Sequence, residues 1–502
     1  MKNQSYLKIL AFGFIYVFAF KEFSYLTADP DLWGHILFGK EIWESGSIPR
    51  TDSYSFTANG ESWINHEWLT EVLFYLIYAN LGSGGLLAFK MILGWTIIFI
   101  LSQSGSYRKT PYPFALSSIL IIPVMGPGFM VRPQLMTFLF AALLIFILRK
   151  FFEGNNRWVF CIPVIFLLWI NCHGGVIAGL GILATVTAIQ WLRKKQSEFL
   201  SWKPLAIVLA GSCLTVLINP YGIELWTFFI KSLSLPRKIN EWAPIPLFDL
   251  SHLPFKVLTL VFLISIFGNR KKQLWEVGVI AISIIFAFKS QRHTVLAAIV
   301  SAPYLADWVS TLANNPLIRK NLETLSTPFK RISHIALGLF IVFQIIMTGY
   351  SYNQNKFQIF VEPTVYPVYL AQFLEHNNIN GNIVSPFDWG EYLIWKRPKS
   401  KVAIDGRFRT VYPEHIIRQA WSFWERKENW REILKNSDIA VVKTTHAGDK
   451  GFENFSKWEK IYKDPICIVY LKQNKRNNDF ITKFRQKKLI NPNVLPPYFF
   501  PG

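Results

Sequence analysis

Charged residues are scarce in this chain. Asp, Glu, Lys and Arg make up 17% of the 502 residues, whereas 51% are apolar. Soluble domains usually carry about a quarter charged residues. This composition excludes an ordinary soluble protein and predicts a chain whose main solvent is a lipid bilayer.

Cysteine is also rare, and the four cysteines show no paired spacing. Three of them, Cys161, Cys172 and Cys213, fall in or beside apolar segments, which argues against a disulfide framework and against a cysteine zinc site. A small-residue cleavage site is missing after the apolar run that ends near Phe20. We therefore expect this run to be a retained anchor helix and not a signal peptide.

Acidic residues are outnumbered, with 32 Asp and Glu against 53 Lys and Arg. Most of the excess cations gather in every second loop between apolar runs, which is typical of cytoplasmic loops. This pattern predicts a cytoplasmic N-terminus and an extracytoplasmic C-terminal region in an inner (plasma) membrane, and it gives no reason to expect a nucleic-acid partner. The basic groups are Arg108-Lys109, Arg149-Lys150 with Arg157, Arg193-Lys194-Lys195, Arg270-Lys271-Lys272, and Arg319-Lys320 with Lys330-Arg331.

Long apolar runs are abundant. A membrane-spanning helix needs roughly 20 mostly apolar residues, and about eleven runs approach this length. We expect a mainly α, polytopic transmembrane domain at 1–350, with its first outer loop at 25–83. Within that loop, Glu67 to Asn80 is short and opens with two glutamates, which favours an amphipathic helix on the outer surface. The expected spans are 6–24, 84–103, 113–128, 133–149, 158–172, 174–192, 203–218, 255–268, 274–288, 293–310 and 333–350.

Residues 351–502 have the composition of a small α/β domain outside the membrane, because short apolar runs alternate with charges and turn residues. The last stretch, from the Lys/Arg/Asn run near 474 to the terminal Pro-Pro-Tyr-Phe-Phe-Pro-Gly, predicts poor order. The periodicities predict helices at 366–376, 413–424 and 429–436, and strands at 382–385, 401–404, 439–443 and 466–471.

Single polar residues beside Gly, Pro and Trp mark the loops of the predicted outer face. Ionisable groups next to a membrane are costly and are usually functional, so their convergence on one face suggests a catalytic chamber. These residues are Asp29, Asp31, His35, His66, Glu67, Arg132, His173, Glu241, Lys289, Arg292 and His293.

The residue types suit the transfer of a sugar from a lipid phosphate. Such a transfer requires a carboxylate base, here Asp29 or Asp31, and stabilisation of the departing phosphate. Arg132, Lys289, Arg292 and His293 are the candidates for neutralising phosphate. His35, His66, Glu67 and His173 are candidates for a divalent metal such as Mg²⁺ or Mn²⁺, or for holding a pyrophosphate.

The order of these features resembles the GT-C superfamily of membrane glycosyltransferases. An anchor helix is followed by an Asp-bearing loop, by the segment His66-Glu67-Trp68-Leu69, by many short spans and by an α/β domain. The segment is similar to the His/Lys-Pro-Pro-Leu of protein O-mannosyltransferases and aminoarabinose transferases, with Glu-Trp in place of the two prolines. The resemblance implies that an acidic residue of the first outer loop, Asp29 or Asp31, is catalytic.

A second resemblance lies in the tail. The segment 385–392 (Ser-Pro-Phe-Asp-Trp-Gly-Glu-Tyr) and the later Asp405-Gly406 are similar to the Trp-Trp-Asp-Tyr-Gly signature and following Val-Asp segment of oligosaccharyltransferase catalytic subunits. This resemblance implies a contact between Asp388 and the acceptor. The Asp-Pro-Asp-Leu-Trp loop, His-Glu-Trp-Leu and Asp-Trp-Gly also resemble a group of bacterial membrane proteins.

Structural roles compete with each of these interpretations. Asp29-Pro30-Asp31 fits a helix N-cap, Arg132 fits a snorkelling side chain, and His173 beside two glycines fits a tight contact between helices. Turn chemistry accounts for Asp388. The tryptophans Trp33, Trp68 and Trp242 lie where a sugar ring would stack, although most aromatics belong to the interfacial belt and the core.

The sequence therefore predicts a membrane-embedded glycosyltransferase that moves a sugar from a polyprenyl-phosphate donor to a glycan, lipid or protein acceptor on the outer face. A transporter or flippase of lipid-linked sugars is the first alternative. It is disfavoured because no inverted repeat or mid-span charge is visible. A non-catalytic scaffold for envelope polysaccharide assembly is the second alternative, and it predicts that Asp29, Asp31 and Arg292 are replaceable.

Overall fold

The computed structural model divides the chain into two compact units. Unit 1 contains Met1–Tyr25 and Leu87–Phe357, and unit 2 contains Leu26–Leu86 and Gln358–Gly502. The first predicted outer loop thus belongs to the same compact unit as the C-terminal domain. The residues that the structure describes are 2–105, 111–193, 202–234, 239–268, 273–316, 318, 327–444, 449–452, 455–491 and 498–502.

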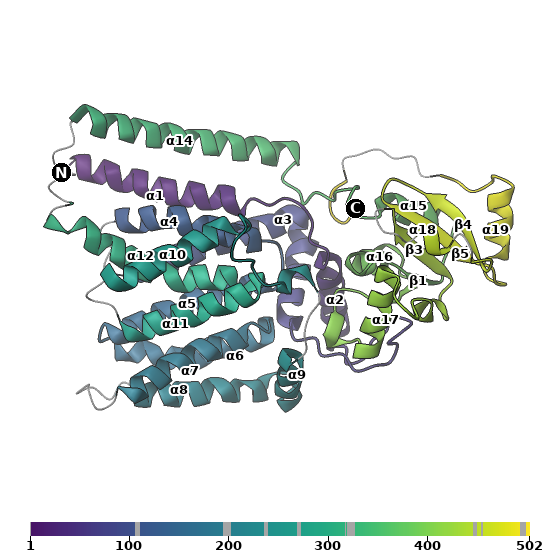
Figure 1. Ribbon diagram of the computed structural model, residues 1–502, viewed down its shortest axis with the longest axis horizontal. Coiled ribbons are helices and arrows are strands. Elements are labelled where there is room, and N and C mark those ends of the chain that lie inside the picture. The colour runs from purple at the N-terminus through teal and green to yellow at the C-terminus, as the bar shows by residue number, and fades with distance from the viewer. Residues whose placement is uncertain are drawn as a thin grey trace. The chain divides into compact units, whose positions relative to one another are not determined.

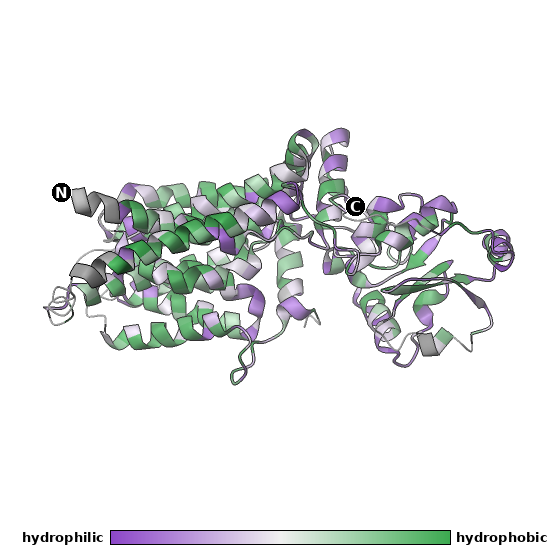
Figure 2. Cartoon of the chain, turned by 90° about the horizontal axis from the view of Figure 1, so that it is seen from above, coloured by the Kyte–Doolittle hydropathy of each residue, from purple (hydrophilic) through white to green (hydrophobic). Residues whose placement is uncertain are grey.

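Unit 1 is a bundle of helices that consist mainly of apolar residues (Figures 1 and 2). Buried Leu, Ile, Phe and Ala side chains fill the space between the helices. The helices are α1 (Lys2–Phe23), α4 (Tyr112–Met125), α5 (Gln134–Phe152), α6 (Ile162–Cys172), α7 (Val176–Leu192), α8 (Trp202–Leu214), α9 (Ile223–Ser234), α10 (Leu253–Gly268), α11 (Leu274–Lys289), α12 (Thr294–Ala313) and α14 (Thr327–Gln354).

Helix α3 (Trp68–Ser102) begins in unit 2 and ends in unit 1. Gly82 interrupts it with φ 63° and ψ −165°, a conformation that only glycine adopts without strain. The kink separates the two segments that the sequence predicts, the amphipathic stretch Glu67 to Asn80 and the span at 84–103.

Within the described ranges, four helices are long and apolar enough to cross a membrane: Trp68–Ser102, Gln134–Phe152, Gln291–Ala313 and His334–Gln354. A fifth span results if the pair Trp202–Ile218 and Ile223–Ser232, bent by 106°, is one crossing. Four further apolar helices are shorter. The count of about eleven spans and the side on which each loop lies stay predictions. Several of the basic groups that support this topology, such as Arg108-Lys109 and Arg270-Lys271-Lys272, lie outside the described residues.

One of the cations assigned to a cytoplasmic loop is buried inside unit 1. Arg149, in the last turn of α5, donates from Nε to Glu276 Oε1 of α11 at 2.7 Å. Its Nη1 donates to Asp307 Oδ2 of α12 at 2.7 Å and to the carbonyl of Ser104 at 3.1 Å. This ion network joins three helices, and because Arg149 and Glu276 are buried, each depends on the other for compensation.

Unit 2 is built on one five-stranded sheet with the order β2-β1-β3-β5-β4. Strands β2, β1 and β3 run parallel, and β3, β5 and β4 are antiparallel. The strands are β1 (Asn382–Val384), β2 (Lys401–Val402), β3 (Ile439–Lys443), β4 (Trp458–Lys463) and β5 (Cys467–Lys472). The helices that belong wholly to this unit are α2 (Leu32–Ser45), α15 (Val368–His376), α16 (Gly390–Lys396), α17 (Glu414–Glu425), α18 (Asp449–Phe452) and α19 (Asn478–Arg485).

The mainly helical architecture with a small α/β domain is confirmed, and each of the four predicted strands is present. Strand β4 was not predicted, because a bulge between Lys460 and Tyr462 breaks the alternation that marks a strand in sequence. The predicted helix at 429–436 is reduced to a single 3₁₀ turn at Glu432–Leu434.

The expectation of a poorly ordered terminal stretch is wrong for α19 (Asn478–Arg485) and for residues 498–502, while residues 492–497 lie outside the described residues. Phe500 is buried, and its amide donates to the carbonyl of Ile359 at 2.8 Å. The aromatic residues in Pro-Pro-Tyr-Phe-Phe-Pro-Gly explain the difference, since they supply apolar area that a solvated tail lacks.

Candidate functional site

The Asp-Pro-Asp loop lies in unit 2 directly before α2. Asp29 is 3% exposed, and its Oδ1 accepts the backbone N–H of Asp31 at 3.1 Å. Asp31 occupies the N-cap position of α2 without a side-chain capping bond, which removes the N-cap explanation for its carboxylate. Asp29 shapes the turn, and Asp31 is the more exposed of the two.

A second carboxyl group, which the sequence did not single out, lies beside Asp31. Glu391, at the start of α16, accepts the backbone N–H of Gly34 at 3.1 Å and is 3% exposed. A Cβ atom at Gly406 would collide with Asp31 Oδ1 and would lie 2.7 Å from Glu391 Oε1. Both carboxyl groups therefore lie over the same glycine, and a larger residue there would have to displace them.

Burial raises the pKa of the Glu391 carboxyl well above its ordinary value, and the negative charges of Asp31 and Asp405 raise it further. Two neighbouring carboxylates in a buried place cannot both be ionised at low cost. Burial and the neighbouring negative charges thus both favour the protonated form of Glu391.

This raised pKa predicts a pH-dependent stability. Between pH 4.5 and the raised pKa, folded protein keeps a proton that unfolded protein releases, so stability falls as the pH rises. Glu391→Gln removes the titration, and its thermal midpoint is expected to exceed that of wild type by roughly 5 °C at about pH 8 and to match it more closely at about pH 5. Thermal unfolding in detergent across this pH range measures the effect. Glu428→Gln, at an exposed position, is the control, and parallel wild-type and Glu391→Gln profiles would contradict the assignment.

A histidine and two glutamates form a compact group near the same loop. His35 Nδ1 lies 3.1 Å from Glu71 Oε1 and 4.0 Å from Glu67 Oε2. One ligand atom from each of the three residues lies within 4.8 Å of the others. Asn65 donates to Glu71 Oε2 at 2.6 Å and so orients that carboxylate. Burial acts to lower the pKa of His35, but the adjacent Glu71 and Glu67 raise it overall.

This group differs in part from the predicted metal ligands. His35 and Glu67 come together as expected, while His66 lies beside Glu67 with Nε2 3.6 Å from Oε1 and is not one of the three. Glu71 takes the third place. It lies four residues after Glu67, so the helical spacing of α3 brings both glutamates to one face, and this spacing is the signal that identifies Glu71.

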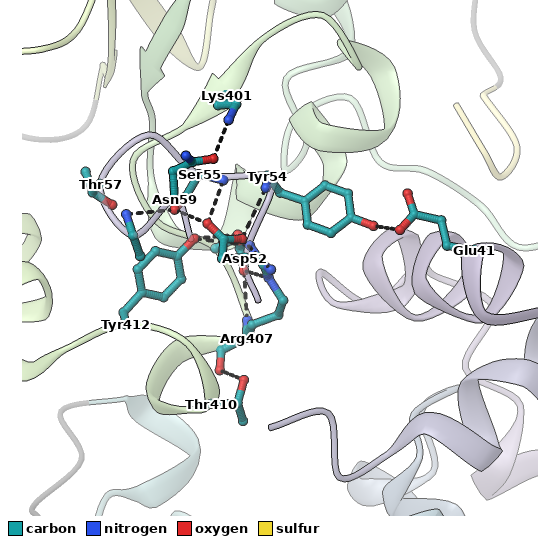
Figure 3. A network of polar contacts seen from close by, with 12 residues as sticks. Glu41, Asp52, Tyr54, Ser55, Thr57, Asn59, Lys401, Arg407, Thr410 and Tyr412 are labelled. Atoms are coloured by element: carbon teal, nitrogen blue, oxygen red, sulfur yellow. Dashed lines mark hydrogen bonds and ion pairs between the residues drawn. The ribbon is translucent and has the colours of Figure 1, made fainter. Parts of the chain in front are cut away.

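Arg407 forms the polar centre of unit 2 (Figure 3). It donates two hydrogen bonds to Asp405, at 2.9 and 2.7 Å, and its Nη1 lies 2.7 Å from Asp52 Oδ1. Tyr412 also donates to Asp405 at 2.6 Å. Aromatic rings surround the guanidinium, and the nearest of them, those of Tyr54 and Trp63, lie at 4.9 Å. This network ties the 52–63 segment to the loop that carries Gly406.

Asp388 lies away from this centre, in a 3₁₀ turn before α16. Its Oδ2 accepts from Lys443 Nζ at 2.8 Å, and the same ammonium lies 5.1 Å from the centre of the Trp389 ring. The carboxylate is partly exposed, so its role in acceptor binding stays a prediction. Trp33, by contrast, is 0% exposed, which overturns the expectation that it stacks on a sugar.

Unit 1 carries a separate cluster of predicted residues. Arg132, just before α5, and Arg292, just before α12, both pair with the carboxylate of Glu241, and the Arg292–Glu241 distance is 3.6 Å. The Arg292 guanidinium lies 5.4 Å from the Trp242 ring centre, and the His293 ring meets the same indole edge-on at 5.8 Å. Burial acts to raise the pKa of Glu241, yet the two arginines lower it overall.

His173 ends α6 and is held in one orientation. Its Nδ1 accepts the backbone N–H of Gly175 at 2.9 Å and lies 2.7 Å from the hydroxyl of Thr137. Because that hydroxyl accepts the Trp169 indole N–H at 2.9 Å, its own proton is directed at His173. Nδ1 is thus an acceptor, and a neutral imidazole carries its proton on Nε2. Lys289 ends α11 with an exposed side chain.

Comparisons with known proteins show the fold. No protein-family profile and no curated protein sequence matches the chain. Among solved structures, the archaeal oligosaccharyltransferase AglB from Archaeoglobus fulgidus, in complex with an inhibitory peptide and a dolichol-phosphate, is similar with a TM-score of 0.56 and 11% identity over 88% of this chain and 69% of that one. A second structure of the Archaeoglobus fulgidus oligosaccharyltransferase, in complex with Zn and sulfate, has a TM-score of 0.52 and 14% identity over 86% and 67%.

The aminoarabinose transferase ArnT from Cupriavidus metallidurans, in the apo state, is also similar, with a TM-score of 0.53 and 10% identity over 94% of this chain and 98% of that one. Both kinds of neighbour belong to the GT-C superfamily, and their likeness confirms the fold that the resemblance in the sequence implies. The chain has the GT-C fold, and four of the described helices are long and apolar enough to cross a membrane.

Proposed function

We propose that this protein is a GT-C-type glycosyltransferase. It moves a sugar from a polyprenyl-phosphate-linked donor to an acceptor on the outer face of the inner membrane, and its C-terminal domain lies on that side. An acidic residue of the first outer loop, Asp29 or Asp31, is the base that takes the proton of the acceptor.

The observation that carries this proposal is the packing of the Asp-Pro-Asp loop in unit 2. The loop joins the C-terminal domain, where Asp31 lies beside Glu391, and a His35 group follows one helical turn later. A buried carboxyl group with a strongly raised pKa, such as that of Glu391, is a feature that clusters at catalytic sites. A purely structural loop would not need so many ionisable groups in so small a space.

The cluster in unit 1 supports a phosphate-binding role. Arg132 and Arg292 converge on one carboxylate, that of Glu241, so the two guanidinium groups already enclose an anion. A phosphate oxygen has the charge and the acceptor geometry to take the place of that carboxylate, and arginine binds phosphate through two parallel hydrogen bonds. The dolichol-phosphate in the AglB complex supports a lipid phosphate as the ligand.

The donor atoms of His35, Glu67 and Glu71 fit a divalent cation. Two carboxylates and one imidazole suit Mn²⁺ or Zn²⁺, and the carboxylate oxygens also suit Mg²⁺. Asn65 donates a hydrogen bond to the Glu71 carboxylate and so orients it, as the hydrogen-bond partners of metal ligands do. When bound, a cation there supplies positive charge for a phosphate oxygen. The zinc and sulfate in the second oligosaccharyltransferase structure support the same chemistry.

The metal proposal predicts direct binding. After EDTA treatment, the purified protein is expected to bind Mn²⁺, as measured by electron paramagnetic resonance. Glu71→Gln is expected to weaken binding by at least about tenfold, since one ligand is lost. Glu61→Gln, at an exposed position of the same segment, is the matched control. Equal Mn²⁺ affinities for wild type and Glu71→Gln would mean that the cation binds elsewhere. Absence of Mn²⁺ binding to wild type would contradict the metal proposal altogether.

A transfer assay tests the function itself. Vesicles that contain the protein and a radiolabelled polyprenyl-phosphate sugar are expected to pass label to an acceptor. Arg292→Ala is expected to raise the donor KM by roughly tenfold or more, because one charge-assisted contact with phosphate is lost. Lys256→Ala, at a cation paired with Asp249 in the same unit, is the control. Label that only changes leaflet would identify a flippase, and no label movement would favour a scaffold.

A further inference from the structure

Three short segments that are distant in sequence lie side by side in unit 2. Ala28 N–H donates to the carbonyl of Phe360 at 2.8 Å, and Phe360 N–H donates to the carbonyl of Leu26 at 2.7 Å. On the other side, Val361 N–H donates to Tyr498 and Phe500 N–H donates to Ile359, at 2.9 and 2.8 Å. Residues 359–361, here named the middle segment, thus lie between the Asp-Pro-Asp loop and residues 498–500, with an isolated β-bridge at Phe360 to each side.

The same C-terminal residues reach the far side of the loop. The indole N–H of Trp33, the second residue of α2, donates to the carbonyl of Pro501 at 2.9 Å. The Phe500 ring lies 5.3 Å from the Trp33 ring, and Tyr366 and Tyr392 meet that indole edge-on at 4.8 and 4.9 Å. Lys396 of α16 donates to the carbonyl of Gly502.

We propose that residues Tyr498–Gly502, here named the strap, fix the Asp-Pro-Asp loop in its working conformation and that Trp33 is a positioning residue. The strap holds the loop at both ends, through the middle segment before Asp29 and through Trp33 after Asp31. Only the expected effect on kcat rests on the proposed function. The effect of the strap on the conformation of the loop does not.

The position of the bond to Trp33 distinguishes the strap from ordinary core packing. Trp33 is followed directly by Gly34, whose N–H binds Glu391. A shift of the first turn of α2 therefore moves Asp31 relative to Glu391. Lys396 and Glu391 both lie on α16, whereas Trp33 lies on α2, which begins directly after Asp31. The strap therefore contacts the helix that carries Glu391 and the helix that follows Asp31.

The test uses the full-length protein with three substitutions. Trp33→Phe keeps an aromatic ring and removes the N–H donor, Phe500→Ala removes the buried ring of the strap, and Ile490→Ala is the control at an exposed apolar position. Two readouts are measured on each protein: the kcat and KM for transfer, and amide hydrogen exchange along unit 2.

We expect Trp33→Phe to speed exchange at Ala28 and Gly34 by about tenfold, as the loss of one hydrogen bond allows. Phe500→Ala is expected to speed exchange at these amides by about a hundredfold or more. In both variants kcat falls at least about tenfold with the donor KM little changed, whereas exchange at Val441 in the central strand β3 and the properties of Ile490→Ala stay as in wild type.

Unchanged exchange at Ala28 and Gly34 would overturn the strap, as would faster exchange spread evenly over the unit, which would mean a general stabilising role. If the wild-type protein transfers no sugar, the proposed function fails, and the exchange measurement alone still decides whether the strap fixes the loop.

Discussion

Vesicles that contain the Asp29→Asn or the Asp31→Asn protein are expected to show a fall of roughly a thousandfold in sugar transfer for one of the two substitutions. This is the scale of effect that loss of a general base produces. Asparagine keeps the shape of aspartate and loses its charge. In the Asp29→Asn protein the new amide oxygen can still accept the backbone N–H of Asp31, so the turn is preserved. A loss of sugar transfer in this protein would therefore result from the loss of the base and not from a change in the conformation of the loop.

The comparison needs proteins of matched abundance. Asp479→Asn, at an exposed position of α19, is the control and is expected to keep the wild-type rate. The position that abolishes transfer identifies the base. If both loop variants transfer sugar at the wild-type rate, neither carboxylate is the base, and the scaffold alternative becomes the better explanation.

The Arg407→Ala protein is expected to show the largest loss of stability. Removing this guanidinium leaves Asp405 and Asp52, at 0% and 2% exposure, without their cation. Breaking a buried ion pair in this way costs about 3–5 kcal/mol. For a unit of this size, the unfolding midpoint is expected to fall by roughly 10 °C, measured by thermal unfolding in detergent.

Arg485→Ala is the matched control for Arg407→Ala. Its side chain also pairs with an acid, Glu459 at 2.9 Å, but the Arg485 side chain is largely exposed. An exposed ion pair contributes about 0–1 kcal/mol, so the midpoint should change little. Equal losses in the two variants would mean that the buried network contributes no more than a surface pair.

The sequence is informative where its signal is local. Apolar runs predict helices, and short alternating stretches predict strands, so β1, β3 and β5 lie close to their expected positions. Asp29, Asp31 and His35 stand out because charged residues directly after an apolar helix are unusual. The same reasoning singled out Arg132, Glu241 and Arg292, which the fold joins into one cluster.

Sequence reasoning fails where a role depends on contacts between distant segments. In the sequence, Glu391 looks like an ordinary glutamate in the first turn of a helix. Its hydrogen bond with Gly34 and its position beside Asp31 over Gly406 arise only in the fold. Trp33 resembles a sugar platform in sequence, yet Phe500 and Tyr366 bury it. No local sequence pattern at Glu391 or Trp33 predicts these contacts, because Gly34 and Phe500 lie hundreds of residues away from them in the chain.

The division of unit 2 into two chain segments has a consequence for biosynthesis. Leu26–Leu86 leave the ribosome first, and Gln358–Gly502 follow only after the whole of Leu87–Phe357 has been made. Until the later segment is made, the early segment lacks its packing partners, and its carboxyl groups and apolar residues stay uncovered while the intervening helices enter the membrane. Chaperones that hold exposed segments are expected to act on 26–86 during this interval, and a nascent chain stalled before residue 358 should be sensitive to protease in that segment.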